Sequence, residues 1–114
     1  MEKINAVAAL ASLAQSSRLD IFRLLVQAGP EGLSAGKIAE AAGILPSSLS
    51  FHLKELGIGN MVSSRQQGRY VIYTANFDTM NGLLAFLTEN CCGGNACNTI
   101  AVPSCNPDKF KEAT

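Results

Sequence analysis

All four cysteines of this 114-residue chain lie in one short stretch near its C-terminus: Cys91, Cys92, Cys97 and Cys105. Thiolates are soft ligands that select soft metal ions, and accessible thiols also react with oxidants. The two glycines after the vicinal pair permit a chain reversal that would bring Cys97 back over Cys91 and Cys92. The spacing therefore predicts a soft-ion site or a redox switch, with Cys105 as an optional fourth ligand or a dispensable thiol.

Thiols remain reduced only in a reducing compartment, so the N-terminal segment bears on their chemistry. Its apolar run, from Ile4 to Leu13, is interrupted by Asn5 and Ser12 and repeats at helical spacing, which favours an amphipathic helix over a signal peptide. No apolar run reaches the roughly 18 residues that span a bilayer. We therefore expect a cytoplasmic protein with no membrane partner.

Hydrophobic residues make up 47% of the chain and charged residues 16%, with a formal net charge of zero. This composition excludes a disordered chain and predicts one packed domain, whose small size favours dimerisation. Because the net charge is zero, a nucleic-acid surface would need a local basic excess. Residues 34–77 carry such an excess, four basic against two acidic residues.

Helical patterns fill the first half of the chain. An apolar stripe of Ile4, Val7, Ala8 and Ala11 predicts a first helix, and Ser17 is expected to cap a second helix ending near Ala28. Ser34 is expected to cap a third helix, with Ile38, Ala41 and Ala42 facing inward and Gly43 ending it. Pro46 then opens a helix with Leu49, Leu53 and Leu56 on one side. The last two helices form a helix-turn-helix candidate.

In the second half of the chain, from Met61, the hydrophobic pattern changes from helical spacing to the alternation that is typical of strands. Residues 61–65 and 69–74 predict two short strands around Gln66-Gln67-Gly68, a β-hairpin. Asp78 is expected to cap a last helix whose apolar stripe runs through Met80, Leu83, Leu84 and Leu87 to Cys91. We expect residues 1–92 to form the folded domain and residues 93–114 a cysteine-containing loop and tail.

This order of elements is that of a winged helix-turn-helix, and the sequence resembles the ArsR/SmtB family of metalloregulatory repressors over residues 10–92. The resemblance is carried by Leu-Ser-Phe-His-Leu-Lys-Glu-Leu at 49–56, with Met-Val-Ser-Ser-Arg at 61–65 and Gly-Arg-Tyr-Val-Ile-Tyr at 68–73. It departs at 57–60, where relatives carry a helix-continuing linker ending in Ala-Gly. The resemblance implies a mainly α (α+β) winged helix with a two-stranded hairpin wing. It also implies a homodimer, formed through the first and last helices, that binds operator DNA.

The helix face opposite the leucines is the expected DNA-reading surface. Serines there can bond base edges or phosphates, Phe51 can touch a thymine methyl, and arginines near the wing turn can reach phosphates or a minor groove. His52, at the margin of the apolar stripe, is either a structural residue or a DNA contact. The candidate DNA-binding residues are Ser47, Ser48, Ser50, Phe51, His52, Lys54, Arg65 and Arg69. The alternative for the serines and arginines is an ordinary solvated surface.

Members of this family bind their metal ions at different positions, so the residues at those positions indicate which ion this chain would sense. Residues 33–40 lack the Cys-Val-Cys pair of one arsenic-sensing branch, and residues 78–90 lack the His and acid pairs that bind zinc. The vicinal pair Cys91-Cys92 resembles the C-terminal arsenite site of another branch. Three close thiols suit As(III), which takes three sulfurs, whereas zinc prefers four tetrahedral ligands.

The sequence thus predicts an arsenite-responsive repressor that dissociates from DNA when As(III), or Sb(III), binds Cys91, Cys92 and Cys97. The alternatives are a thiol-based redox-sensing repressor or a sensor of Sb, Cd or Zn. A thiol metalloid carrier or an arsenate reductase is the rival from another class, but neither needs a reading helix and a wing. No set of residues for nucleophilic or acid-base catalysis stands out, so we do not expect an enzyme.

Overall fold

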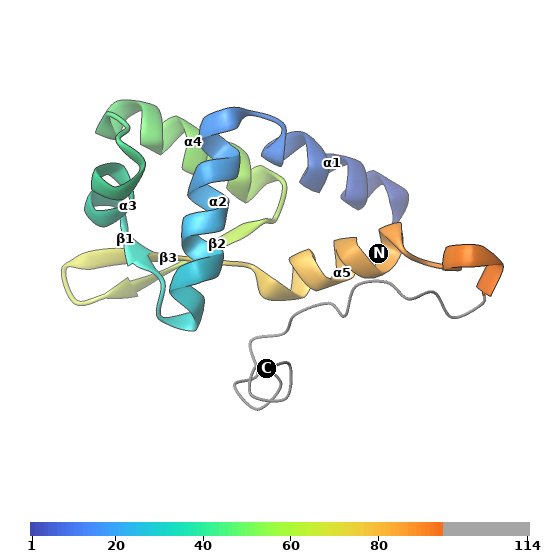
Figure 1. Cartoon of the computed structure of the whole chain (residues 1–114). Helices are drawn as coiled ribbons and strands as arrows, with labels where there is room; N and C mark the ends of the chain where they lie inside the picture. The colour runs from blue at the N-terminus through green and yellow to red at the C-terminus, as the bar shows by residue number, and fades with distance from the viewer. Residues whose placement is uncertain (95–114) are drawn as a thin grey trace, which may run out of the picture.

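A computed structural model describes residues 1–94, so Cys97 and Cys105 lie outside the described residues (Figure 1). The helices are α1 (Lys3–Leu13), α2 (Ser16–Ala28), α3 (Ala35–Ala42), α4 (Pro46–Ile58) and α5 (Phe77–Leu87), with short 3-10 turns η1 (Gly29–Glu31) and η2 (Cys91–Gly94). The strands are β1 (Leu33–Ser34), β2 (Val62–Gln67) and β3 (Tyr70–Ala75). None of the helices within residues 1–94 is long and apolar enough to cross a membrane.

The helix-turn-helix forms as the sequence predicts. The hydroxyl of Ser34 accepts a hydrogen bond from the backbone N–H of Lys37 at 3.4 Å, and Gly43 ends α3 in the left-handed conformation at φ 67°. Pro46 occupies the first turn of α4, where its missing N–H costs no intrahelical bond. One inward residue was wrongly predicted: Ala41 is exposed, and Ala39 packs on the core instead.

Two helix caps each lie two residues before the predicted position. The side chain of Gln15, not Ser17, caps α2 by accepting from the Arg18 N–H at 2.9 Å. Asn76, not Asp78, caps α5 by accepting from the Thr79 N–H at 3.3 Å. A cap must have extended backbone just outside the helix, whereas Ser17 and Asp78 already lie in the first turn.

The predicted hairpin is present and has a third strand beside it. β2 and β3 pair antiparallel from Val62 with Ala75 to Gln67 with Tyr70, and Gly68 starts the turn at φ 63°. The two-residue strand β1 adds to the other edge of β3, so the sheet order is β1-β3-β2. β1 could not be predicted, because a strand of two residues carries no hydrophobic period.

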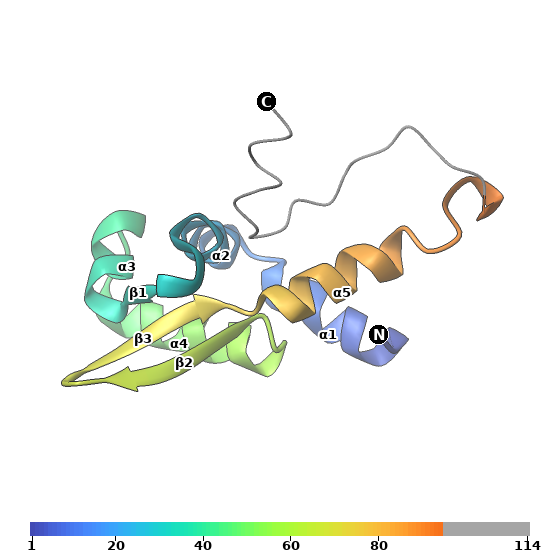
Figure 2. The same ribbon diagram turned by 90° about the horizontal axis from the view of Figure 1, so that it is seen from below.

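One apolar core joins the helices to the base of the sheet. Its largest fully buried side chains are Ile21, Leu25, Ile38, Leu49, Leu56 and Met61. α3 and the hairpin tip lie at one end of the protein, and α1 and α5 lie together at the other (Figures 1 and 2). The molecule therefore has a helix-turn-helix end and a terminal-helix end.

The apolar stripe predicted for α1 faces outward. Ala6, Ala9 and Ser12 are its buried residues, whereas Ile4 is 73% exposed and Val7 is 58% exposed. At the same end of the protein, Leu87 of α5 is also exposed. Exposed apolar side chains on both helices of this end are what a surface covered by another protein would present.

The predicted continuation of the α5 stripe to Cys91 is wrong. α5 ends at Leu87, with Thr88 as its C-cap, and Asn90 takes a positive φ of 56° before η2 begins. A helical face cannot extend through a left-handed residue. Cys91 and Cys92 therefore lie in a separate turn beyond the helix.

The contact between α1 and the end of α4 depends on one glycine. A Cβ on Gly59 would lie 2.9 Å from the carbonyl oxygen of Ala8 and would overlap the side chain of Ser12, whereas a Cβ on Gly57 would meet nothing within 4 Å. We predict that Gly59→Ala lowers the free energy of unfolding by about 2 kcal/mol, since overpacking forces the helices apart. Gly57→Ala, the matched control, is expected to raise it by about 0.5 kcal/mol through helix propensity. Urea unfolding followed by circular dichroism measures both, and equal effects would contradict the close packing.

Candidate nucleic-acid interface and cysteine site

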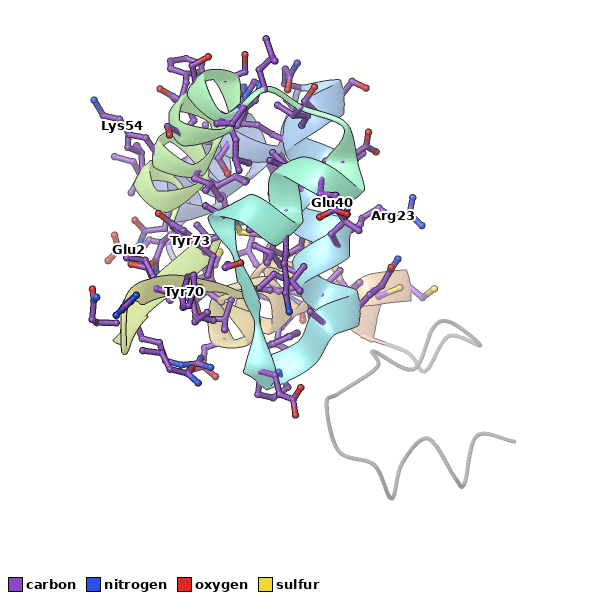
Figure 3. The ribbon with its side chains drawn as sticks, turned by 90° about the vertical axis from the view of Figure 1, so that its left-hand side faces the viewer. Glu2, Arg23, Glu40, Lys54, Tyr70 and Tyr73 are labelled. Carbon is purple, nitrogen blue, oxygen red and sulfur yellow. The ribbon has the colours of Figure 1, made fainter. Side chains whose placement is uncertain are left out.

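α4 presents polar and aromatic side chains to solvent because three leucines hold its other side in the core. Leu49, Leu53 and Leu56 are buried, as predicted. Ser47, Phe51 and Lys54 follow one another at intervals of four and three residues on the opposite side, and Ser48 and Ser50 flank them, all exposed. Lys54 projects away from the body of the protein (Figure 3). This outward side of α4, residues 47, 48, 50, 51 and 54, is called the reading face below.

Two side chains of the reading face have defined contacts. The hydroxyl of Ser50 donates to the carbonyl oxygen of Pro46 at 3.1 Å, which leaves its oxygen able to accept a hydrogen bond. Phe51 is 56% exposed, and its ring meets the ring of His52 edge to face, with centroids 5.7 Å apart. The exposed aromatic ring is thus held in place by its neighbour.

His52 lies at the edge of the buried side, as its spacing predicts. It is half-buried, and its Nδ1 is buried with no hydrogen-bond partner among the described residues. The histidine therefore contributes a contact to Phe51, and its direct contact with DNA stays a prediction.

The two arginines of the hairpin have different surroundings. The guanidinium of Arg65 donates to the backbone oxygens of Pro30 at 3.2 Å and Glu31 at 2.8 Å, which ties β2 to η1. Arg69 is exposed in the two-residue turn that joins the strands. Arg69 is therefore the better placed of the two for a phosphate or a groove.

Two residues that were not among the predicted DNA contacts lie together beside the reading face. Lys37 of α3 and Tyr70 of β3 line one hollow of about 340 Å³, together with Gly32, Leu33, Ser34 and Ile72. Tyr70 is on the same side of the protein as Lys54, below α4 in Figure 3. The two residues come together through the pairing of β1 with β3, which the sequence pattern does not reveal.

The two described candidate ligands are neighbours. The Sγ atoms of Cys91 and Cys92 lie 3.8 Å apart, and both residues are exposed. This separation is less than twice a typical metal–thiolate bond of about 2.3 Å, so both sulfurs can reach one ion. Residues 1–94 contain no group of three His, Cys, Asp or Glu suited to a metal.

Comparison with known proteins agrees with this architecture. A family model described as a helix-turn-helix domain matches residues 13–57. The arsenical resistance operon repressor of Bacillus subtilis is 33% identical over 81 residues, which cover 71% of this chain and 73% of the relative. The nodulation protein NolR of Rhizobium meliloti is 31% identical over 80 residues, or 70% of this chain, but the chain spans only 63% of its length.

A solved structure supports the fold. The homodimeric winged helix-turn-helix DNA-binding domain of a Mycobacterium bovis protein superposes with a TM-score of 0.61, covering 83% of this chain and 88% of that one. At 22% identity this likeness concerns the fold alone. With the reading face, the hairpin wing and the Bacillus relative taken together, the chain belongs to the ArsR family of winged-helix transcriptional regulators.

Proposed function

We propose that this regulator is a homodimeric repressor that binds operator DNA and dissociates from it when As(III) binds Cys91, Cys92 and Cys97. The observation that carries the proposal is the pair of sulfurs 3.8 Å apart, just beyond α5. The name of the Bacillus relative, an arsenical resistance operon repressor, supports it.

The proposed DNA contacts follow from the two exposed elements of the helix-turn-helix end. The reading face of α4 enters the major groove, where its serines and Phe51 meet base edges and Lys54 meets a phosphate. Arg69, at the hairpin turn, reaches the backbone or minor groove beside it. Arg65 stays a candidate contact, although two of its donor groups already bond η1.

The proposed dimer uses the other end. Ile4 and Val7 of α1 and Leu87 of α5 are exposed apolar residues that a second copy would cover. A two-fold dimer also places two reading helices on an inverted repeat about one helical turn apart. Dimerisation therefore both buries these apolar side chains and creates the pair of reading helices that binds operator DNA.

The proposed link between the thiols and the dimer is the chain that leaves α5. Only Thr88, Glu89 and Asn90 separate Leu87 from Cys91. Drawing three sulfurs onto one ion moves this short connection and with it the exposed end of α5. A roughly 100-fold loss of DNA affinity requires about 3 kcal/mol of difference in ion affinity between free and DNA-bound protein.

A second candidate function uses the same residues. Because Cys91 and Cys92 are exposed cysteines, an oxidant is an alternative signal. Two thiols would lose two electrons and two protons to a peroxide, which is reduced to water, and the disulfide would alter the end of α5. Antimony, cadmium or zinc are the other soft-ion alternatives.

The dimer interface gives the first test of this function. We predict that Val7→Glu produces a monomer in light scattering at micromolar concentration, because a carboxylate cannot be buried unpaired in an apolar interface. Leu45→Glu, at an equally apolar and 72% exposed residue of the opposite end, is the control and is expected to remain a dimer. A dimeric Val7→Glu variant, or a monomeric wild type that binds DNA with full affinity, would contradict the interface.

The wing and the reading face should differ in sequence dependence. Arg69→Ala is expected to weaken binding equally on operator and random duplexes and to lower the slope of log affinity against log salt by about 0.9, as for one lost phosphate contact. Ser50→Ala should instead cost about 1 kcal/mol at particular base pairs. Fluorescence anisotropy at several salt concentrations measures both. Equal losses on both duplexes for both variants would show that α4 does not read the bases.

The thiols are tested by release from DNA in a phosphine reductant, because dithiol reductants compete for arsenite. Cys91→Ser, Cys92→Ser and Cys97→Ser are each expected to keep DNA binding and lose release by arsenite, while Cys105→Ser stays inducible. If Cys97→Ser is released normally and Cys105→Ser is not, the third ligand is wrong. If peroxide releases the wild type and arsenite does not, the redox function replaces the arsenite one.

A further inference from the structure

Three polar residues form a closed ring of hydrogen bonds where α4 ends and α5 begins. Asn60 Nδ2 donates to Thr79 Oγ1 at 3.1 Å, and Asn76 Nδ2 donates to Asn60 Oδ1 at 3.3 Å. The backbone N–H of Thr79 donates to Asn76 Oδ1, also at 3.3 Å, which closes the ring. Both side-chain amides thus use their nitrogen and their oxygen within this ring.

The ring lies at the base of the hairpin and joins its two ends. Asn60 lies two residues beyond the end of α4, Asn76 directly follows β3, and Thr79 is in the first turn of α5. The backbone N–H of Asn76 also donates to the carbonyl oxygen of Met61 at 2.8 Å. β3 leads straight into α5 beside the end of α4 (Figure 2). The ring therefore ties the segment after the helix that carries the reading face to the helix that precedes the cysteines.

α1 meets the same junction from its other side. Gly59 packs against Ala8 and Ser12, and Asn60 and Thr79 line a hollow of about 410 Å³ with Met1 and Asn5 of the N-terminal segment. Residues of α1, of the end of α4 and of the start of α5 thus meet around one hollow. The orientation of α4 relative to α1 and α5 therefore depends on the contacts of Gly59 and Asn60.

Asn60 is unusual in its backbone as well as its contacts. It has a φ of 59°, the left-handed region that asparagine and glycine tolerate best. Its side chain is exposed, so it adds little to the core, and it does not belong to the reading face. Its two side-chain hydrogen bonds therefore join separate elements and do not add to the core.

We propose that Asn60 and Thr79 are positioning residues, which hold α4 at one fixed angle to α5 and so set the distance between the two reading helices of the dimer. This inference rests on the proposed DNA-binding homodimer, and it is independent of arsenite. If the angle between α4 and α5 is fixed, the dimer binds DNA tightly at one half-site spacing and weakly at others. If the ring is broken, each reading helix stays folded, but its angle to α5 can vary, so the dimer can also bind sites whose half-sites are further apart.

The test compares two spacings of one DNA site. The probe is a duplex selected by the wild-type protein from a random-sequence pool, and the second duplex carries two additional base pairs between the half-sites. Asn60→Gly removes the side chain without backbone strain, and Thr79→Val removes the hydroxyl at constant shape. The matched controls are Asn90→Gly, another left-handed asparagine, and Thr88→Val, whose hydroxyl donates only within its own helix end.

We expect the ratio of affinities for the correct and the widened site to fall at least tenfold in Asn60→Gly and Thr79→Val. Dimerisation and binding to random DNA should stay unchanged, and both controls should keep the wild-type ratio. Thr79→Ser, which retains the hydroxyl, should keep the wild-type ratio. If Thr79→Val folds poorly, the comparison of Asn60→Gly with Thr79→Ser tests the inference.

An unchanged ratio in both ring variants, or an equal fall in the controls, overturns the inference alone. If the wild type selects no duplex from the pool, or binds as a monomer, the proposed function fails and the inference fails with it. The two failures are therefore distinguishable in one set of measurements.

Discussion

The arrangement of this protein depends on the burial of three leucines along one side of α4. Leu49, Leu53 and Leu56 pack into the same core as Ile38 of α3 and Leu25 of α2, and each such side chain contributes about 2 kcal/mol when removed from water. Because these leucines occupy one face of α4, the residues on the opposite face, which include the serines, Phe51 and Lys54, point to solvent. The reading face is thus a consequence of the core, and its chemistry can vary without loss of the fold.

Elements with strong local patterns could be predicted from the sequence. The α4 leucines, the cap at Ser34, the ending at Gly43 and the hairpin turn at Gly68 are all as expected, because each depends on a few neighbouring residues. Non-local features could not be predicted: β1 is recognisable only by its pairing with β3, and the Asn60 ring joins residues up to 19 positions apart. The stripe of α1 was identified correctly, but periodicity does not tell whether a helix buries its apolar side in its own chain or against another.

The candidate sensing site was predicted by residue type and only partly by position. Four clustered cysteines indicate thiol chemistry in any fold, and Cys91 and Cys92 are indeed adjacent. Their expected place on α5 was wrong, because helical periodicity was extended past Thr88 and the left-handed Asn90. The correction changes the proposed mechanism: the thiols pull on the end of α5, whose first turn holds the ring with Asn60. α5 spans about 16 Å at 1.5 Å per residue, and it connects the proposed sensor to the reading helix.

The central claim is that binding of As(III) by three thiols and release of DNA are one event. The most direct measurement titrates arsenite into the reduced protein bound to its selected duplex, and follows fluorescence anisotropy and the number of reactive thiols in the same sample. The account predicts that three of the four thiols per chain become unreactive in parallel with the loss of bound DNA. Protection of three thiols while the DNA stays bound, or release of DNA with all four thiols still reactive, would contradict it.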